Sequence, residues 1–574
     1  MEANPTEKKT EDPRGALWIK RWDGMKTARQ PWDTQWQEIA NYFLPGKANI
    51  QNYTLYPNST REAQLFTTKP HDAAITCAAG LLAWTTPGNE AWFSWEPAQR
   101  LAKSDPTKLW LQEASDAARM LLAKSNFYVE RHEDLLSHVA FATSAMYYYL
   151  DDEGNTIFES LKIGSYCIAN NSKGLADTLY REIVLTARQA EQEFGRENLP
   201  ENIAKCLDGD AKEQDKTFTF IHVVEPRPKG ERHEGPGPAH AKKKAWVSAY
   251  VEKESKCVIK EGGYDRFPFS VGRWMKWETN EGTSVWGYGP GFSALPDARQ
   301  LNFMRKMLAT GIEKTVFPPI FVPDVLEGEL DVSSRGVNYY PPGMGQEKVF
   351  PLNIVGNLEV GERGCIEAEK AVEDKFHVKF FQLFGELSQR PGTPPTATQI
   401  QEMAGERLVQ ISPAFARIAY EKDSPMLENL FEMWLEANLL PMPPEEAIEK
   451  DDSGQGFTPN PSVTYTSRLA LAARALRNHA FDRSFARILQ LAQVKPDILD
   501  NIDDAVMVRD SMMNDGVPAG WIRNKKDVDA LQQQRAQAAV QQQQMQMLEQ
   551  GTKAAGNLGK APAGVQEMVG GAAK

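Results

Sequence analysis

Residues 293–316 read SALPDARQLNFMRKMLATGIEKTV, and this stretch decides the interpretation of the fold. Apolar residues recur in it every three or four positions, the spacing that places side chains on one face of a helix. Pro296 suits a first helical turn, and Asp297 there complements the helix dipole. The stretch therefore predicts an amphipathic helix over 293–316. Its apolar face holds Leu301, Met304, Leu308 and Ile312.

A second helical run follows at 361–384. Its apolar stripe consists of Cys365, Ala368, Val372, Phe376, Phe380 and Leu383. The intervening residues 317–360 are rich in proline and glycine and contain short β-like pieces such as PIFVP. We therefore predict two helices joined by an irregular segment.

The stretch RPGTPPTATQI at 390–400 interrupts the helical pattern again. Thr396 and Thr398 each have a glutamine three residues later, which is the spacing of a capping box. The following run, 398–438, is helical in pattern, with Pro413 and Pro425 as expected kinks. One interpretation of 390–400 is a plain loop between helices.

The rest of the chain mixes helical and strand patterns, so we expect an α+β fold that is mainly helical. In the first helical region Pro31 is expected to interrupt the pattern. Further helical patterns are 107–124, 128–145 and a C-terminal region ending at 548. Aromatic strands around DDEGN predict a β-hairpin at 146–158. Other strand patterns are TFTFIHVVEP, AWVSAYVE, KCVIK and SVTYTS, and 549–574 is expected to be disordered.

Composition narrows the class of protein. The chain has 574 residues, a net charge of -12 and five cysteines. This length suggests about three or four units, and the acidic balance disfavours a surface that grips nucleic acid throughout. Without a Cys-x-x-Cys pair, a reducing compartment is favoured over a disulfide framework. Neither a signal peptide nor an apolar run of spanning length is apparent, so no membrane association is expected.

No pattern in the sequence predicts a catalytic site, a metal site or a cofactor. His132 and His138 miss the spacing of H-E-x-x-H. The stretch GYGPG at 287–291 lacks the rest of a phosphate-loop fingerprint, so a bend is the favoured interpretation. Asp151 and Asp152 lie in the predicted hairpin turn, where acidic residues are common.

Several stretches together resemble the family of portal, or head-to-tail connector, proteins of short-tailed phages. The resemblance runs from about residue 17 to 545. The stretches are RQPWDTQWQEIANYFLP (29–45), AAGLLAWTTPGNEAWF (78–93), SNFYVERHEDLL (125–136), LYREIVLTARQAEQEFG (179–195), FPFSVGRW (267–274), YGPGFSALPDARQLN (288–302), PPTATQIQEMAGER (394–407) and VTYTSRLALAARA (463–475). The sequence departs from the resemblance at two places. A basic residue expected near Pro290 is missing, which puts a phosphate contact at the bend in doubt. The stretch AFATSAMYYY at 140–149 lacks an expected Gly-Thr pair, which concerns local packing.

The resemblance implies a ring of about twelve subunits at one capsid vertex, with double-stranded DNA passing through it without sequence preference. It implies a fold of wing, stem, clip and crown. The expected division is a flexible N-terminus (1–16), wing (17–292), first stem helix (293–316), clip (317–360), second stem helix (361–384), tunnel loop (385–397), long wing helix (398–462), crown (463–548) and disordered tail (549–574). Expected partners are the terminase large subunit, the major capsid and scaffolding proteins, and tail adaptor proteins. The expected location is the portal vertex of the virion, after assembly in the host cytoplasm.

Site residues follow from this resemblance. The tunnel loop would present Gln389, Arg390 and Gly392 to DNA. Stem candidates for the channel lining are Glu369, Glu373, Lys375 and Lys379. Clip candidates for contacts with terminase or tail are Asp324, Glu327, Glu329 and Arg335. The apolar stripes of both stem helices would pack either between subunits, which we favour, or within one subunit.

The charges of 361–384 also permit two interpretations. Balanced charges would let DNA pass with little friction, because a ring repeats every unpaired cation. Ordinary pairs on a solvated helix face would give the same pattern. Two other functions stay open at this point: an enzyme acting on nucleotides through the 287–291 bend, and a helical scaffold without a channel.

Overall fold

The largest sheet of the described residues has five antiparallel strands in the order β4-β5-β6-β7-β8. The structure is a computed structural model that describes residues 12–51, 65–97, 105–232, 240–279, 282–317, 320–321, 350–351, 357–382, 411–450, 456–466, 488, 507 and 525–558. The strands of this sheet are β4 (Tyr166–Asn170), β5 (Ala176–Thr186), β6 (Thr217–Pro226), β7 (Trp246–Glu252) and β8 (Val258–Tyr264). The strands predicted from TFTFIHVVEP, AWVSAYVE and KCVIK are therefore confirmed.

A second, three-stranded sheet has the order β3-β2-β9. Strands β2 (Thr143–Leu150) and β3 (Thr156–Ser160) form the predicted hairpin, and β9 (Phe269–Arg273) pairs with the other edge of β2. The hairpin turn is held by Asp151, whose Oδ1 accepts bonds from the backbone N–H groups of Glu153 and Asn155. This confirms a structural role for Asp151 in the turn.

Within the described ranges, four two-stranded ribbons accompany the two larger sheets. Strand β1 (Phe93–Glu96) pairs with β16 (Ser462–Tyr465), which confirms the strand in SVTYTS. β10 (Met275–Thr279) pairs with β11 (Gly282–Tyr288), and β12 (Ile320–Phe321), from PIFVP, pairs with β13 (Phe350–Pro351). The last ribbon joins β14 (Glu449–Lys450) to β15 (Gly456–Phe457).

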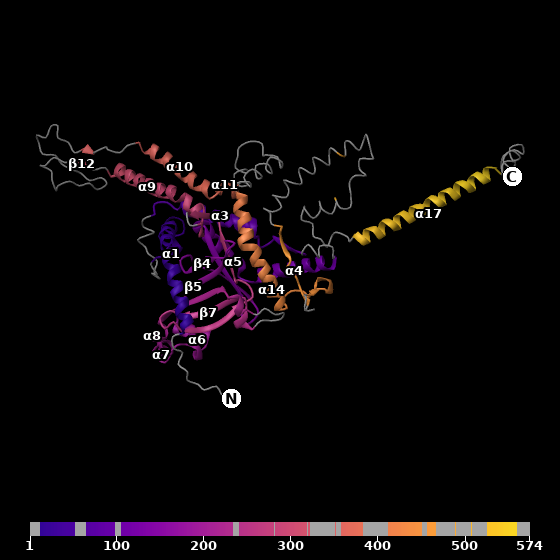
Figure 1. The fold of residues 1–574 in the computed structure, drawn as a ribbon. Coiled ribbons are helices and arrows are strands. Elements are labelled where there is room, and N and C mark those ends of the chain that lie inside the picture. Colours follow the sequence, from indigo (N-terminus) through magenta and orange to yellow (C-terminus); the bar gives the residue numbers. More distant parts are fainter. Residues whose placement is uncertain are drawn as a thin grey trace, which may run out of the picture.

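The described helices either lie beside these sheets or project away from them (Figure 1). They are α1 (Pro13–Phe43), α3 (Lys69–Thr85), α4 (Asp105–Lys124), α5 (Phe127–Phe141), α6 (Ala187–Phe194), α7 (Glu201–Leu207), α8 (Ala211–Gln214), α9 (Pro290–Val316), α10 (Leu358–Lys375), α11 (Val378–Phe381), α14 (Ser424–Glu436) and α17 (Lys525–Leu558). One large core lies among α1, α3, α5 and the inner ends of α9 to α11, and a second lies between α4 and α14. The mixture of helices and antiparallel sheets agrees with the expected α+β class.

Pro31 does not interrupt the first helix, so that prediction is wrong. Helix α1 runs through Pro31 for 31 residues. Pro31 is exposed, so water can satisfy the carbonyl that loses its partner. Trp22 and Trp36, before and after it, are fully buried, and their packing holds both halves in place.

Several other helix ends differ from the predictions. The helix predicted over 128–145 ends at Phe141, because Ala142 adopts a left-handed conformation with φ 58° and β2 begins at once. The run 361–384 is not one helix within its described part, since His377 has φ 53° between α10 and α11. Helix α17 extends to Leu558, into the region expected to be disordered.

Candidate functional site

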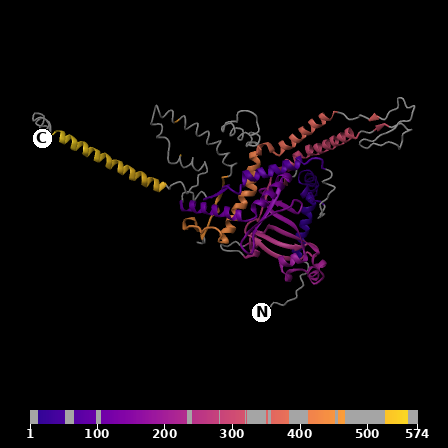
Figure 2. The ribbon, with the colours of Figure 1, turned by 180° about the vertical axis from the view of Figure 1, so that it is seen from behind.

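Helices α9 and α10 form an antiparallel hairpin that projects from the body of the fold, and both views show it (Figures 1 and 2). Leu301, Cys365 and Ala368 are buried between the two helices, with Met304 and Leu308 packed against them. A Cβ atom on Gly364 would lie 2.4 Å from Cε of Met304, so glycine there permits the close approach of the helices. The apolar stripes thus pack within the chain over most of their length.

An arginine links the two helices across the hairpin. The guanidinium of Arg305 on α9 donates to Glu362 at 3.1 Å and to Glu369 at 2.6 Å on α10. These carboxylates raise the pKa of Arg305, chiefly through the hydrogen bond to Glu369. The link fixes the register of α9 against α10, with one guanidinium held between two carboxylates.

The inner end of the hairpin is anchored in the main core. Phe376 packs against Phe43 with ring centres 5.1 Å apart, and Phe380 packs against Trp84 at the same distance. Phe381 lies directly over Gly80 on α3. The break at His377 lets these rings enter the core. In a continuous helix, the same rings would be carried past the core.

The outer surface of the hairpin carries both charged and exposed apolar groups. Exposed charged residues of α10 are three acids and three bases: Glu359, Arg363, Glu367, Lys370, Asp374 and Lys375. Those of α9 are three bases and one acid: Arg299, Lys306, Lys314 and Glu313. Phe303 and Met307, one helical turn apart, lie on the side of α9 that faces away from α10 and are 61% and 47% exposed. Together with Ile312, a residue of the predicted stripe that is 49% exposed, they offer apolar surface to another molecule.

The four predicted stem residues lie on or next to α10, in different surroundings. Glu369 pairs with Arg305 inside the hairpin, and Glu373 lies 3.9 Å from the Nζ of Lys69 on α3. Lys375 is exposed, and Lys379 donates to Asp374 at 2.6 Å. The predicted tunnel-loop and clip residues lie outside the described residues. These are Gln389, Arg390, Gly392, Asp324, Glu327, Glu329 and Arg335.

A group of buried charged residues, which the sequence did not predict, lies beside the helix of residues 411–436, whose last part is α14. This helix passes through a π-turn at Ala419–Asp423, just before Pro425, which lacks the N–H group that an α-helix needs. The Nζ of Lys422 donates to Asp134 of α5 and to the hydroxyl of Ser144 of β2, both at 2.7 Å. The predicted kink at Pro425 thus lies where the helix changes from a π-turn to an α-helix.

The neighbours of Lys422 form equally buried pairs. Asp423 accepts a bond of 2.7 Å from Arg131 of α5, and Glu421 accepts one of 3.1 Å from Arg273 of β9. Burial alone would raise the pKa of Asp134, but Lys422 and Arg131 outweigh it and hold that pKa below its usual value. Three consecutive turn residues therefore join the helix to three other elements. No spacing rule in the sequence signals this network, because its partners lie far apart along the chain.

The glycines of the 287–291 stretch serve close packing. A Cβ atom on Gly291 would lie 2.0 Å from the carbonyl oxygen of Ala140, and the N–H of Gly287 donates to Oγ1 of Thr143 at 2.8 Å. Gly289 caps α9, and Pro290 is at its start. The interpretation of this stretch as a bend is confirmed, and its backbone is occupied by protein contacts.

Among the described residues, no group of three or more His, Cys, Asp or Glu side chains is placed to hold a metal ion. His138 is fully buried beside Ser144, and its partner in the sequence pattern, His132, is partly exposed. No helix in the described part of the chain is long and apolar enough to cross a membrane.

Comparison with known proteins identifies the family. A profile described as "Bacteriophage head to tail connecting protein" matches residues 16–522. The chain belongs to this family. One relative of the chain is the "Probable portal protein" of Bordetella phage BPP-1, with 28% identity over 95% of both chains. Another is the "Portal protein" of Salmonella phage epsilon15, with 25% identity over 92% of both chains. None of these descriptions names a catalytic activity.

Proposed function

We propose that this chain is a portal protein, which forms a ring of about twelve copies at one vertex of a phage capsid. Double-stranded DNA enters through the ring during packaging and leaves through it during ejection. The α9–α10 hairpin is the observation that most supports this proposal. It projects from the body (Figure 1), is anchored in the core at one end, and carries exposed apolar residues that suit contacts between copies.

Electrostatics supports the passage of DNA between such hairpins. Helix α9 has 27 residues, which corresponds to about 40 Å at 1.5 Å per residue. Duplex DNA carries about one charge per 1.7 Å, so about 24 phosphates would lie within that length. A net positive wall, repeated in each copy, would bind the DNA tightly. The exposed charges of α10, three acidic and three basic, sum to zero, and those of α9, three basic and one acidic, sum to +2. Four acids thus offset four of the six exposed bases of the hairpin, and one further base, Arg299, is paired with Glu38.

The remaining segments receive proposed roles in the same assembly. Residues 17–292 and 398–462 would form the wing, 317–360 the clip and 463–548 the crown. The clip would contact the terminase large subunit and later the tail adaptor proteins, through Asp324, Glu327, Glu329 and Arg335. The wing would contact the major capsid and scaffolding proteins. Assembly would take place in the host cytoplasm before the ring becomes part of the virion.

The tunnel loop, 385–397, would bring Gln389 and Arg390 close to the DNA. Gly392 permits a sharp reversal of the chain, and the neighbouring prolines restrict its conformations. We expect Arg390→Ala to change packaging or retention of DNA while rings still form. Failure of the rings to assemble would instead show that Arg390 has a structural role.

Electron microscopy of the purified chain tests the proposal directly. The expected images show rings with a central hole wide enough for duplex DNA. Phe303→Glu should weaken ring assembly because it places a charge in an apolar contact, while the matched control Phe303→Leu should assemble normally. A chain that stays monomeric at high concentration would contradict the proposal.

A further inference from the structure

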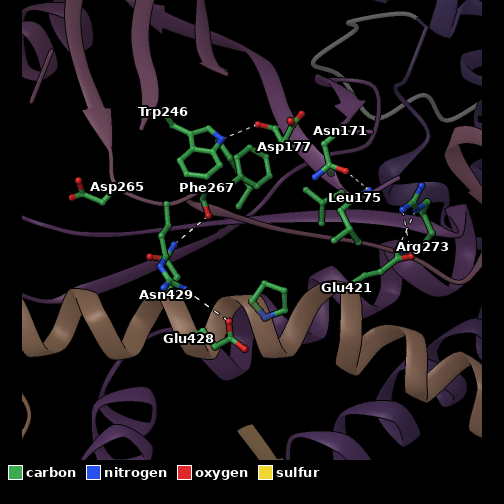
Figure 3. A pocket seen from close by; sticks show the side chains of 15 residues that line it. Asn171, Leu175, Asp177, Trp246, Asp265, Phe267, Arg273, Glu421, Glu428 and Asn429 are labelled. Atoms are coloured by element: carbon green, nitrogen blue, oxygen red, sulfur yellow. Dashed lines mark hydrogen bonds and ion pairs between the residues drawn. The ribbon is translucent and has the colours of Figure 1, made fainter. Parts of the chain in front are cut away.

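A pocket of about 450 Å³ lies between the helix 419–436 and the strands that face it (Figure 3). Its floor is β9, with Val271 and Arg273, and one wall is the helix, with Glu428 and Asn429. The opposite wall comes from the β4–β5 turn and from β7. The volume falls within the range of about 300–1,000 Å³ that is typical of ligand sites.

Two aromatic side chains form rigid walls of this pocket. The indole N–H of Trp246 donates to the carbonyl oxygen of Asp177 at 3.0 Å, which fixes the ring in place. The carbonyl oxygen of Phe267 accepts bonds from Tyr148 and Asn429, so the backbone behind the second ring is also held. Figure 3 shows both side chains at the pocket. Aromatic faces attract cations through their electron-rich surfaces.

The charged lining is acidic. It contains four carboxylates and two guanidiniums, so its net charge is -2: Asp177, Asp265, Glu421 and Glu428 against Arg266 and Arg273. Such a lining disfavours phosphates and nucleic acid, because both carry negative charge.

Both guanidiniums are already engaged within the protein. Arg273 pairs with Glu421 at 3.1 Å and donates to the carbonyl oxygen of Gly174 at 2.7 Å. Arg266 binds Glu432, which lies outside the pocket lining, at 2.5 Å. Of the two, Arg266 also reaches an acid of the pocket lining, Glu428, but only at 3.9 Å.

Two carboxylates remain incompletely paired. Among the residues that the structure describes, no cation lies within 4.0 Å of the Asp177 carboxylate. This carboxylate accepts a bond of 3.1 Å from the hydroxyl of Thr178 and one from its own backbone N–H, and Arg21 attracts it from farther away. Glu428 has a single ion pair, at 3.9 Å to Arg266. Partial burial raises the pKa of both carboxyls, so an incoming cation would offset an existing desolvation cost.

We propose that this pocket binds an arginine or lysine side chain from a basic segment of a partner protein. The stem of such a side chain would pack on Trp246 and Phe267, and its charged head would reach Asp177 and Glu428. The proposal concerns the face between helix 419–436 and the sheets, and it does not depend on the α9–α10 hairpin lining a channel.

Binding of short peptides to the purified full-length chain tests the proposal. The probes are acetyl-Gly-Arg-Gly-amide and its citrulline analogue, which keeps the shape of arginine without the charge. Equilibrium dialysis should show clearly stronger binding of the arginine peptide. Equal binding of the two peptides would overturn the proposal.

Variants then locate the binding site. Asp177→Asn with Glu428→Gln should weaken binding of the arginine peptide by about tenfold or more, which corresponds to about 1.4 kcal/mol or more. The matched control is Asp152→Asn with Glu153→Gln, which removes the same charge from the exposed β2–β3 turn and should leave binding unchanged. Equal loss in both double variants would mean that the peptide responds only to the overall charge of the protein, and would overturn the proposal. If the pocket variant does not fold, the comparison of arginine with citrulline on the natural chain still decides.

Discussion

The ammonium nitrogen of Lys422 lies 2.7 Å from Oδ1 of Asp134, and neither side chain is exposed to solvent. We expect Lys422→Met to destabilise the protein by about 3–5 kcal/mol, because it leaves Asp134 buried without this partner. Urea unfolding at a fixed protein concentration measures the change. The control, Lys205→Met, removes an exposed lysine whose pair with Glu201 contributes about 0.3–0.5 kcal/mol. Similar losses in the free energy of unfolding for both variants would show that the buried pair of Lys422 stabilises the protein no more than an exposed pair does.

His138 should make the protein less stable in acid. Burial, followed by repulsion from Lys422, lowers the pKa of His138 from 6.5 to about 3. Below pH 6.5 the unfolded chain binds a proton at His138 more readily than the folded chain does. The contribution of His138 to the free energy of unfolding is therefore fully present above pH 6.5 and declines as the pH falls towards 3. The free energy of unfolding of His138→Asn should therefore fall less between pH 7 and pH 5 than that of the natural chain. His132→Asn is the control, and equal slopes for the His138 variant and the natural chain would refute this expectation.

Gly80 should tolerate no side chain, because α11 packs directly on it. A Cβ atom there would lie 2.2 Å from the ring of Phe381, so Gly80→Ala should cost about 1–3 kcal/mol. In contrast, a Cβ atom on Gly24 of α1 would meet nothing within 4 Å. Gly24→Ala should stabilise the protein by about 0.5–1 kcal/mol through helix propensity. Urea unfolding of both variants distinguishes these opposite signs, and a neutral Gly80→Ala would mean that Phe381 can move aside.

Arg305 should hold the α9–α10 hairpin together locally. Arg305→Ala removes its bonds to Glu362 and Glu369, and we expect a loss of about 0.5–1 kcal/mol, since these groups are partly exposed. Hydrogen exchange of the amides of 358–375 should become faster, with little change in the main sheet. The control is Arg363→Ala, whose side chain is 75% exposed and 3.8 Å from Glu359. Equal acceleration in both variants would contradict a bridging role for Arg305.

The elements with strong local patterns were predictable from the sequence. The stretch 293–316 lies inside α9, and the alternating apolar residues of TFTFIHVVEP lie in β6. Local patterns failed where distant packing decides the conformation. Pro31 stays helical because Trp22 and Trp36 are buried on either side of it, and His377 breaks the run because Phe376 and Phe380 enter the core.

The candidate site was only partly predictable for the same reason. The charges of 361–384 were visible in the sequence, but their partners were not. Glu369 faces Arg305 across the hairpin, while Lys375 is exposed. The local sequence does not indicate which of Glu369 and Lys375 is paired and which is exposed, because that depends on which side of α10 faces α9.

The π-turn at Ala419–Asp423 makes the two parts of this helix differ in how they can change in length over evolution. The π-turn holds one residue more than a turn of α-helix, so it can lose that residue and become a regular turn. Removing one residue at the start of α14 would instead rotate everything after the deletion by about 100° relative to everything before it. Leu427, Leu430 and Trp434, which are fully buried, would then leave the core. Aligned homologues should therefore show no net change in length between Ser424 and Trp434.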